Sequence, residues 1–356
     1  MKEHFLHKKL QERDQLQAFR KLKITEGMID FCSNDYLGIV KNDLLQPAHH
    51  YKHGSTGSRL LSGNYPLAEE AENLIASFHQ SPSALLFNSG YDANVGLLSC
   101  VPQKGDTILY DQLCHASIRD GIRLSFAQAF SFRHNDVEDL QKKLQSATGE
   151  VFIVTESVFS MDGDLAPLHD LINLCEQHNC HLILDEAHAT GVIGERGEGL
   201  AQHLQLHEKC FARVHTFGKA VGCHGAVVLG SAALRDYLIN FSRPFIYTTA
   251  LPEMSVAAIC ESYKIFPQMV KERSHLQELI STFQLNPRML RSTTPIQGIV
   301  IPGNEAVKQV AASLQKNGFD VRPILYPTVP KGGERLRIVL HSFNTKDQLK
   351  NLNNLF

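Results

Sequence analysis

The sequence predicts an α/β protein with a large domain built on a mostly parallel sheet and a smaller C-terminal α/β domain. Three observations support this. Short apolar runs alternate with helical patterns through the middle of the 356-residue chain, as in a parallel sheet covered on both faces. Polar clusters follow four of these runs, at the strand ends where such sheets bind ligands. After Pro252 the pattern changes to a long helical segment followed by two further strands.

The first clear element is a predicted helix over 66–80. Pro66 suits the first turn, and Glu69 and Glu70 lie near the positive end of the helix dipole. Apolar residues then recur on one face. The strands of the large domain are predicted at apolar runs, most of them with β-branched content: 84–87, 107–110, 151–155, 181–185 and 211–215. A helical pattern over 168–178 lies between two of them.

The C-terminal part is predicted to be mainly helical over 254–284, with strands at 296–301 and 336–340. A final helix opens with a capping-box pattern from Thr345 to Gln348 and carries Leu349, Leu352 and Leu355. We therefore expect an N-terminal arm over 1–30, a large domain over 31–268 and a small domain over 269–356.

Composition limits the possible functions. A hydrophobic content of 43% can supply a large core, and a net charge of −2 argues against a general nucleic-acid binder. Residues 1–14 are polar, and no apolar run approaches the ~18 residues of a membrane-spanning helix. We expect a cytoplasmic protein with no membrane partner.

The eight cysteines are scattered and form no C-x-x-C pair, so we expect reduced thiols. Cys175, His178, Cys180 and His181 lie close together in the chain. No second ligand pair has zinc-type spacing, and His181 begins an apolar strand. We therefore predict no metal site.

The polar clusters at the four strand ends carry the chemistry. Their members are Asp111 and His115; Glu156, Ser157 and Ser160; Asp185 and His188; Thr216 and Lys219. Each residue alone has a simpler explanation: an aspartate after a strand is often a helix cap, a lone histidine is often structural, and a lone lysine is often solvated. The coincidence of four clusters at four strand ends is more informative than any single residue.

Lys219 is the most telling of these residues. It stands among small and apolar neighbours, from Phe217 to Gly222, where burial lowers the pKa of a lysine and makes its amine nucleophilic. Asp185 follows an earlier strand, and Thr216 precedes the lysine. A lysine for a Schiff base, an acid for a pyridinium nitrogen and small donors for a phosphate are what pyridoxal phosphate requires. The residues therefore predict this cofactor.

Two other motifs are excluded. The letters from Asp185 to His188 match a box of nucleic-acid helicases, but such enzymes also need G-x-x-x-x-G-K-[ST]. Ala220 follows Lys219, and the first glycine position is Arg213. The spacing of Thr216 and Lys219 is similar to S-x-x-K, but the nucleophilic serine is absent and no K-T-G follows.

The chain resembles the α-oxoamine synthases, which are fold-type I pyridoxal phosphate enzymes. The resemblance is carried by SNDYLG at 33–38, GSTGSR at 54–59, NSGYDAN at 88–94, DQLCHAS at 111–117, ESVFSMDG at 156–163, FIYTTALP at 245–252, PTVPKGGERLR at 327–337 and LHSFNT at 340–345. These motifs cover nearly the whole chain in order. The resemblance implies a seven-stranded, mostly parallel sheet and a homodimer.

The resemblance also implies roles for residues around the cofactor ring. Lys219 would form the covalent link and move protons at the substrate Cα. Asp185 would pair with the ring nitrogen. His115 would stack on one face of the ring, and Ala187 would pack on the other. On the O3′ side of the ring, the resemblance implies hydrogen bonds from His188 and Ser157.

For the phosphate, the resemblance implies Thr216 and the backbone of Gly90 and Tyr91. A helix is predicted to begin near Gly90, which would offer N–H groups and a positive dipole end to the phosphate. Thr248 and Thr249 resemble residues that reach the phosphate of the partner subunit.

For the substrate, the resemblance assigns the amino-acid carboxylate to Arg337, with Asn34 nearby. Arg335 is the alternative, because residues two apart share a strand face. The family histidine near Ala68 is missing, and both termini look short for the family, which leaves the contacts to the acyl donor undefined.

The implied reaction is a decarboxylative condensation of an amino acid with an acyl thioester. Within the family, the resemblance favours L-alanine and a pimeloyl thioester carried on coenzyme A or acyl carrier protein. One alternative is a synthase that uses glycine or serine, such as a 2-amino-3-ketobutyrate ligase. Others are a transaminase on the same fold, or a non-catalytic partner subunit, against which Lys219 argues.

Overall fold

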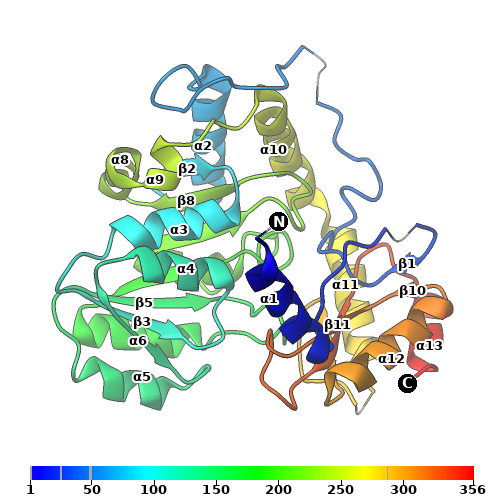
Figure 1. The fold of residues 1–356 in the computed structure, drawn as a ribbon. Helices are drawn as coiled ribbons and strands as arrows, with labels where there is room; N and C mark the ends of the chain where they lie inside the picture. Colours follow the sequence, from blue (N-terminus) through cyan, green and yellow to red (C-terminus); the bar gives the residue numbers. More distant parts are fainter. Residues whose placement is uncertain (1, 25, 48–49, 287) are drawn as a thin grey trace. The chain divides into compact units, whose positions relative to one another are not determined.

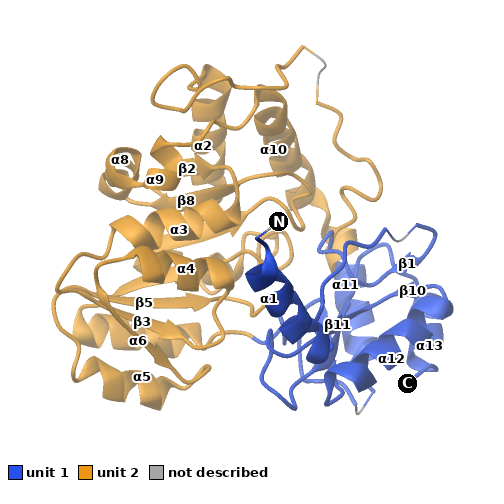
Figure 2. Cartoon of the chain, viewed as in Figure 1, with its two compact units in different colours: residues 1–36, 161–164, 274–356 blue, residues 37–160, 165–273 orange. Residues whose placement is uncertain are grey.

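The computed structural model describes residues 2–24, 26–47, 50–286 and 288–356. The chain divides into two compact units (Figure 2). Unit 1 comprises 1–36, 161–164 and 274–356, and unit 2 comprises 37–160 and 165–273. The N-terminal segment therefore groups with the C-terminal part of the chain. The three-part division at residues 30 and 268 stays a prediction.

Unit 2 is built on a seven-stranded sheet in the order β2-β8-β7-β6-β5-β3-β4 (Figure 1). All neighbouring strands from β7 to β4 are parallel, and β8 runs antiparallel to both β7 and β2. The strands are β2 (Ser83–Phe87), β3 (Thr107–Asp111), β4 (Gln128–Phe132), β5 (Val151–Glu156), β6 (His181–Asp185), β7 (Ala212–Thr216) and β8 (Ala226–Gly230). The predicted mostly parallel sheet is confirmed.

Helices follow most of these strands. They are α2 (Pro66–Phe78), α3 (Gly90–Cys100), α4 (Ala116–Leu124), α5 (Val137–Leu144), α6 (Leu168–His178), α7 (Leu200–His203), α8 (Ala232–Phe241), α9 (Arg243–Ile246) and α10 (Glu253–Ile265). Short 3-10 turns, η1 (His207–Lys209) and η2 (Phe266–Gln268), complete the unit. Helices α3 and α4 lie side by side (Figure 1), and α3 packs on the apolar faces of β7 and β8.

Strand β4 was not predicted from the sequence, for a physical reason. It lies at one edge of the sheet, and four of its five residues are exposed. Since an edge strand needs little apolar surface, its sequence lacks the pattern of the central strands.

Unit 1 has a three-stranded antiparallel sheet in the order β11-β12-β9. Its strands are β9 (Ile296–Val300), β11 (Arg322–Ile324) and β12 (Arg335–Val339), and a separate parallel pair is formed by β1 (Ile29–Asp30) and β10 (Phe319–Asp320). The helices are α1 (His4–Gln15), α12 (Asn304–Lys316) and α13 (Lys346–Asn353). The capping box between Thr345 and Gln348 is present, and Leu349 and Leu352 are buried.

The segment predicted to be mainly helical over 254–284 is confirmed: it consists of α10, η2 and α11 (Val270–Phe283), with η2 between the two helices. Pro267 lacks a backbone N–H and cannot continue the hydrogen-bond ladder. Leu355 lies beyond the end of α13 and is 42% exposed, so it does not extend the buried face. Among the described residues, no helix combines the length and apolar character needed to cross a membrane.

Candidate active site

The carboxyl ends of the parallel strands bring the predicted residues of unit 2 to one edge of the sheet. Glu156 ends β5 and Asp185 ends β6, and the two are direct neighbours in the strand register. Thr216 ends β7, the next strand. The sequence clusters separated by long stretches of chain therefore meet at the edge where open parallel sheets bind ligands.

Asp185 is 6% exposed, and each of its carboxylate oxygens accepts a hydrogen bond. Oδ1 accepts from the backbone N–H of Ala187 at 2.9 Å, and Oδ2 accepts from the Asn94 amide nitrogen at 2.7 Å. Both donors are neutral, and together they fix the orientation of the carboxylate. A buried aspartate held in this way suits a protonated ring nitrogen.

His115 caps the N-terminus of α4. Its backbone N–H donates to Oε1 of Glu156 at 2.5 Å, which ties the start of α4 to the end of β5. Its Nδ1 lies 2.8 Å from the Ser117 hydroxyl. The residue as a whole is exposed. Desolvation lowers the pKa of His115, with the Asp185 carboxylate opposing the shift and Lys219 adding to it.

Glu156 is 3% exposed, beside Asp185. Burial, followed by the neighbouring Asp185 carboxylate, raises the pKa of Glu156 to about 8. Two carboxyl groups this close in a buried setting favour one proton between them. Glu156 accepts from the His115 amide whether or not it carries this proton.

The N-terminus of α3 forms a cradle for an anion. Ser89 caps the helix by accepting from the backbone N–H of Asp92 at 3.1 Å. The first N–H groups of a helix have no partner within it, and the dipole is positive there. A Cβ at Gly90 would lie 3.3 Å from both Cβ and Oγ1 of Thr216, so glycine allows this close approach. Backbone donors and one hydroxyl around a glycine fit a phosphate group.

Lys219 lies in a tight turn after β7. It is half-buried, and its neighbours Phe217, Ala220 and Val221 are fully buried. The Gly222 N–H donates to the Lys219 carbonyl at 2.9 Å, and Gly222 has a φ of +67°. The turn thus presents the lysine from a fixed backbone at the same sheet edge as Asp185 and Thr216.

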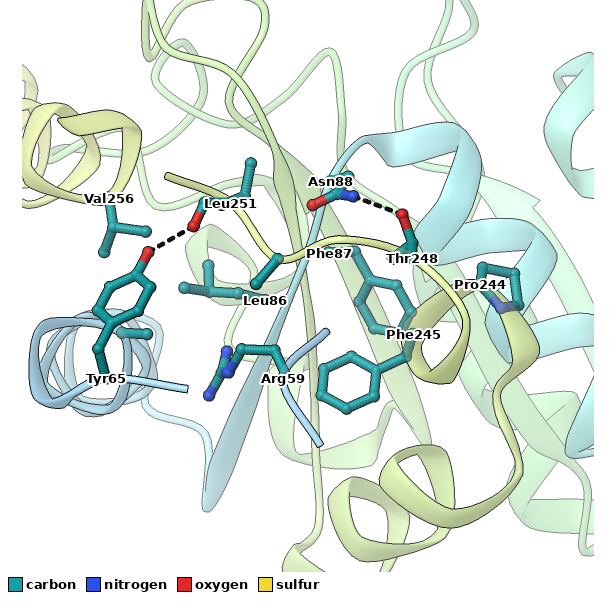
Figure 3. Close-up of a pocket in the computed structure, with 12 residues that line it drawn as sticks. Arg59, Tyr65, Leu86, Phe87, Asn88, Pro244, Phe245, Thr248, Leu251 and Val256 are labelled. Carbon is teal, nitrogen blue, oxygen red and sulfur yellow. Dashed lines mark hydrogen bonds between the residues drawn. The ribbon is translucent and has the colours of Figure 1, made fainter. Parts of the chain in front are cut away.

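Thr248 and Thr249 lie in unit 2 beside the chain that leads into α3. The Asn88 amide donates to the Thr248 hydroxyl at 2.9 Å and to the Thr249 carbonyl at 2.8 Å. Figure 3 shows Asn88 and Thr248 beside an apolar pocket whose lining includes Phe87, Phe245 and Leu251. The Thr249 side chain is exposed, whereas Thr248 is half-buried.

Three other strand-end residues are held locally. Ser157 is fully buried, and its hydroxyl donates to the Asp185 carbonyl at 3.2 Å, so it supports the end of β6. Its predicted role at O3′ stays a prediction, as does that of His188, which is 6% exposed. Asp111 accepts from the backbone N–H of Leu113 and of Asn135, both at 2.8 Å. Asp111 is therefore a structural cap.

In unit 1, the two arginines of β12 have different partners. Arg335 forms an ion pair with Asp162. Arg337 donates to Oδ1 of Asn34 at 3.0 Å, and this oxygen also accepts from the Tyr36 hydroxyl at 3.2 Å. Both arginine side chains are half-buried, and Leu336 between them is buried, as the alternating sequence predicts.

Sequence reasoning missed Asn94 and Ser117 as site residues. They are 2% and 1% exposed, on α3 and α4. The signal for Asn94 was a polar side chain inside an otherwise apolar helical stretch, since buried polar groups require partners. Ser117 gave no comparable signal, because serine is common in a first helical turn.

The family model described as "Aminotransferase class I and II" matches residues 26–354. An 8-amino-7-oxononanoate synthase from Emericella nidulans is 42% identical over 98% of this chain and 93% of its own length. A putative 8-amino-7-oxononanoate synthase from Haemophilus influenzae is 43% identical over 91% of this chain and 89% of its own length.

Two solved structures show the same fold. The 8-amino-7-oxononanoate synthase from Francisella tularensis has a TM-score of 0.78 and 32% identity, over 93% of this chain and 97% of its own. A serine palmitoyltransferase from Sphingomonas wittichii has a TM-score of 0.90 and 26% identity, over 100% and 97%. The chain therefore belongs to the aminotransferase class I and II family. It is a pyridoxal-phosphate-dependent enzyme of fold type I, as the sequence predicted.

Proposed function

We propose that this enzyme condenses L-alanine with a pimeloyl thioester, with loss of carbon dioxide, to give 8-amino-7-oxononanoate. The observation that carries the proposal is the 42% identity, over 98% of the chain, to a relative of that name. The strand-end groups of unit 2 supply the functions that such a reaction requires. The cytoplasmic location and the carrier of the thioester, coenzyme A or acyl carrier protein, stay predictions.

When bound, pyridoxal phosphate supplies an electron sink for the negative charge that develops at the substrate Cα. In this proposal Asp185 holds the ring nitrogen protonated, and His115 and Ala187 lie on the two ring faces. Lys219 takes the proton from Cα of alanine and returns one later. The two neutral donors on Asp185 support this role, because they fix the orientation of the carboxylate.

The phosphate would be held by Thr216 and the first N–H groups of α3, at Gly90 and Tyr91. The close packing of Gly90 against Thr216 supports this placement. His188 and Ser157 complete the proposed contacts on the O3′ side.

Arg337 would bind the alanine carboxylate, with Asn34 alongside. The contact between Arg337 and Asn34 supports this placement, because it holds the guanidinium beside the residue that is predicted to lie near the substrate carboxylate. Arg335 forms an ion pair with Asp162. A guanidinium offers two parallel N–H groups to a carboxylate.

The protein would act as a homodimer in which Thr248 and Thr249 complete the phosphate site of the partner. Thr249 is exposed, and Tyr247, on the other side of Thr248, is 73% exposed. These exposed side chains support a surface here that the partner subunit covers. Light scattering of dilute holoenzyme should give twice the 39.8 kDa chain mass. An active monomer would contradict this assignment.

The deciding experiment is mass spectrometry of the products from pimeloyl-CoA with alanine, glycine or serine. Alanine should give 8-amino-7-oxononanoate, and exclusive turnover of serine would favour the runner-up suggested by the fold of serine palmitoyltransferase. Conversion of the cofactor to its amine form by alanine alone would indicate a transaminase. Borohydride should fix the cofactor to Lys219 and leave the Lys219→Ala variant unlabelled.

A further inference from the structure

Asn94 connects the two groups that we place at the cofactor ring. Its amide nitrogen lies 2.7 Å from Oδ2 of Asp185 and 3.0 Å from the Ser117 hydroxyl. A side-chain amide nitrogen carries two hydrogens and accepts none. Asn94 therefore donates to both oxygens and uses both of its N–H groups.

The backbone N–H of Ser117 fixes the direction of the remaining hydrogen bond. This N–H donates to Nδ1 of His115 at 3.2 Å, so Nδ1 is an acceptor and carries no proton. The Ser117 hydroxyl, which lies 2.8 Å from Nδ1 and accepts from Asn94, therefore donates its own hydrogen to Nδ1. Nδ1 thus receives two donors, which leaves the ring proton on Nε2.

We propose that Asn94 and Ser117 are positioning residues that hold His115 as a neutral ring with its proton on Nε2 and couple its orientation to that of Asp185. All the bonds in this chain lie within unit 2. Asn94 is carried by α3, the helix that also begins at the phosphate cradle. One helix therefore sets the phosphate contacts, the ring-nitrogen carboxylate and, through Ser117, the histidine on the ring face.

The backbone of His115 closes the same network. Its N–H donates to Glu156, the strand neighbour of Asp185. The charged groups that act on the imidazole are Asp185, Lys219 and Asp120. His115 is therefore anchored by both its amide and Nδ1, although the residue as a whole is exposed.

The test is the tautomer of His115 in holoenzyme with nitrogen-15-labelled histidines. The His115 signals are assigned by their loss in His115→Phe. We expect Nδ1 to be unprotonated and Nε2 protonated at neutral pH. A proton on Nδ1 in the unsubstituted enzyme would overturn the proposal without any variant.

Ser117→Ala removes one donor to the neutral ring and should raise the proton affinity of His115 about two- to tenfold. Ser117→Thr keeps the hydroxyl and should restore the original value. Asn94→Leu should weaken cofactor binding about ten- to a hundredfold, because Asp185 loses a donor. Ser99→Ala, on the same helix α3, is the matched control and should change neither quantity.

Suppose that Ser117→Ala unfolds at the same temperature as the unsubstituted enzyme and that the proton affinity of His115 is unchanged. This result would contradict the proposed chain of hydrogen bonds from Asn94 through Ser117 to His115. The inference depends on the proposed function only for the placement of the cofactor. A different product in the mass-spectrometry assay would overturn the proposed substrates and leave the tautomer result intact. If the enzyme makes the expected product but His115 carries its proton on Nδ1, only the proposed chain of hydrogen bonds to His115 is overturned.

Discussion

Unit 2 contains two buried polar clusters that look alike in composition and differ in place. The strand-end cluster consists of Asp185, Asn94, Ser117, His115 and Glu156. The histidine cluster consists of His79, His215, Thr190, Tyr263 and Arg213. Both combine ionisable groups with shifted pKa values. The first includes the last residues of β5 and β6, whereas the second joins Arg213 and His215, within β7, to residues of other elements.

The histidine cluster is buried and bonded mainly within the protein interior, although Nε2 of His215 and Nη1 of Arg213 have no hydrogen-bond partner among the described residues. His79 and His215 are 0% exposed, and their ring centroids are 4.0 Å apart. His79 bonds to the Tyr263 hydroxyl at 3.0 Å, and His215 bonds to the Thr190 hydroxyl at 2.8 Å. Arg213 donates to the backbone carbonyl of His79 at 2.7 Å. These partners are all protein groups of the interior, which indicates a structural role.

The strand-end cluster has an open side. Its members are hydrogen-bonded to one another within the protein, while His115 is exposed. The comparison teaches that burial and a shifted pKa do not mark a site by themselves. A buried polar cluster becomes a candidate site where its outer groups face a region that a ligand can enter.

The largest contrast between the clusters should appear in turnover. Asp185→Asn should keep the fold and lower turnover on the order of 10²-fold or more, because an amide cannot hold the ring proton. Thr190→Val, in the histidine cluster, should lose about 1–3 kcal/mol of unfolding free energy and keep its turnover. Steady-state kinetics and urea unfolding of both variants measure this. Near-normal turnover in Asp185→Asn would remove the functional distinction between the clusters.

The arginines of β12 extend the contrast to unit 1. Arg337→Lys should weaken alanine binding by about 1.5–3 kcal/mol, roughly ten- to a hundredfold, since lysine lacks the guanidinium fork. Arg335→Lys is the matched control, because Arg335 is held by Asp162. A spectral titration with L-alanine measures both. If only Arg335→Lys shows the loss, the two roles are exchanged.

The two clusters should respond to pH in opposite directions. The folded pKa of Glu156 is raised to about 8 from an ordinary value of 4.5. The folded state therefore holds a proton that the unfolded state releases, and stability should fall as the pH rises through this window. Glu156→Gln, which still accepts from the His115 amide, should flatten this slope in urea unfolding. Exposed Glu208→Gln should leave the slope unchanged.

For the histidine cluster the sign is reversed. Burial, and then the charge of Arg213, holds the pKa of His79 well below its ordinary value of 6.5. The unfolded state takes up the proton first, so stability should be complete above pH 6.5 and fall below it, by at most about 1.4 kcal/mol per pH unit for one histidine. His79→Gln should make the acid slope shallower. His4→Gln, on the surface of α1, should not.

Most of the architecture was predictable because its signals are local. The run 181–185 and the pattern 168–178 coincide with β6 and α6. Strand periodicity also placed Arg335 and Arg337 on one face. Strands β4 and β8 were not predicted. Strand β4 lies at an edge and is exposed, so it lacks an apolar pattern, whereas β8 is buried over four of its five residues.

The sequence by itself determined the fold class, the cofactor and the strand-end residues. It could do so because parallel strands of apolar composition must end at a common edge, where Asp185, Thr216 and Lys219 follow them. Only the tertiary structure decided which buried polar groups bond to which. Asn94 and Ser117 lie on different helices, and the packing of α3 on α4 brings them within 3.0 Å. Likewise, the ion pair with Asp162 distinguishes Arg335 from Arg337. Such pairings depend on distances between elements far apart in the chain, which no local pattern of residues encodes.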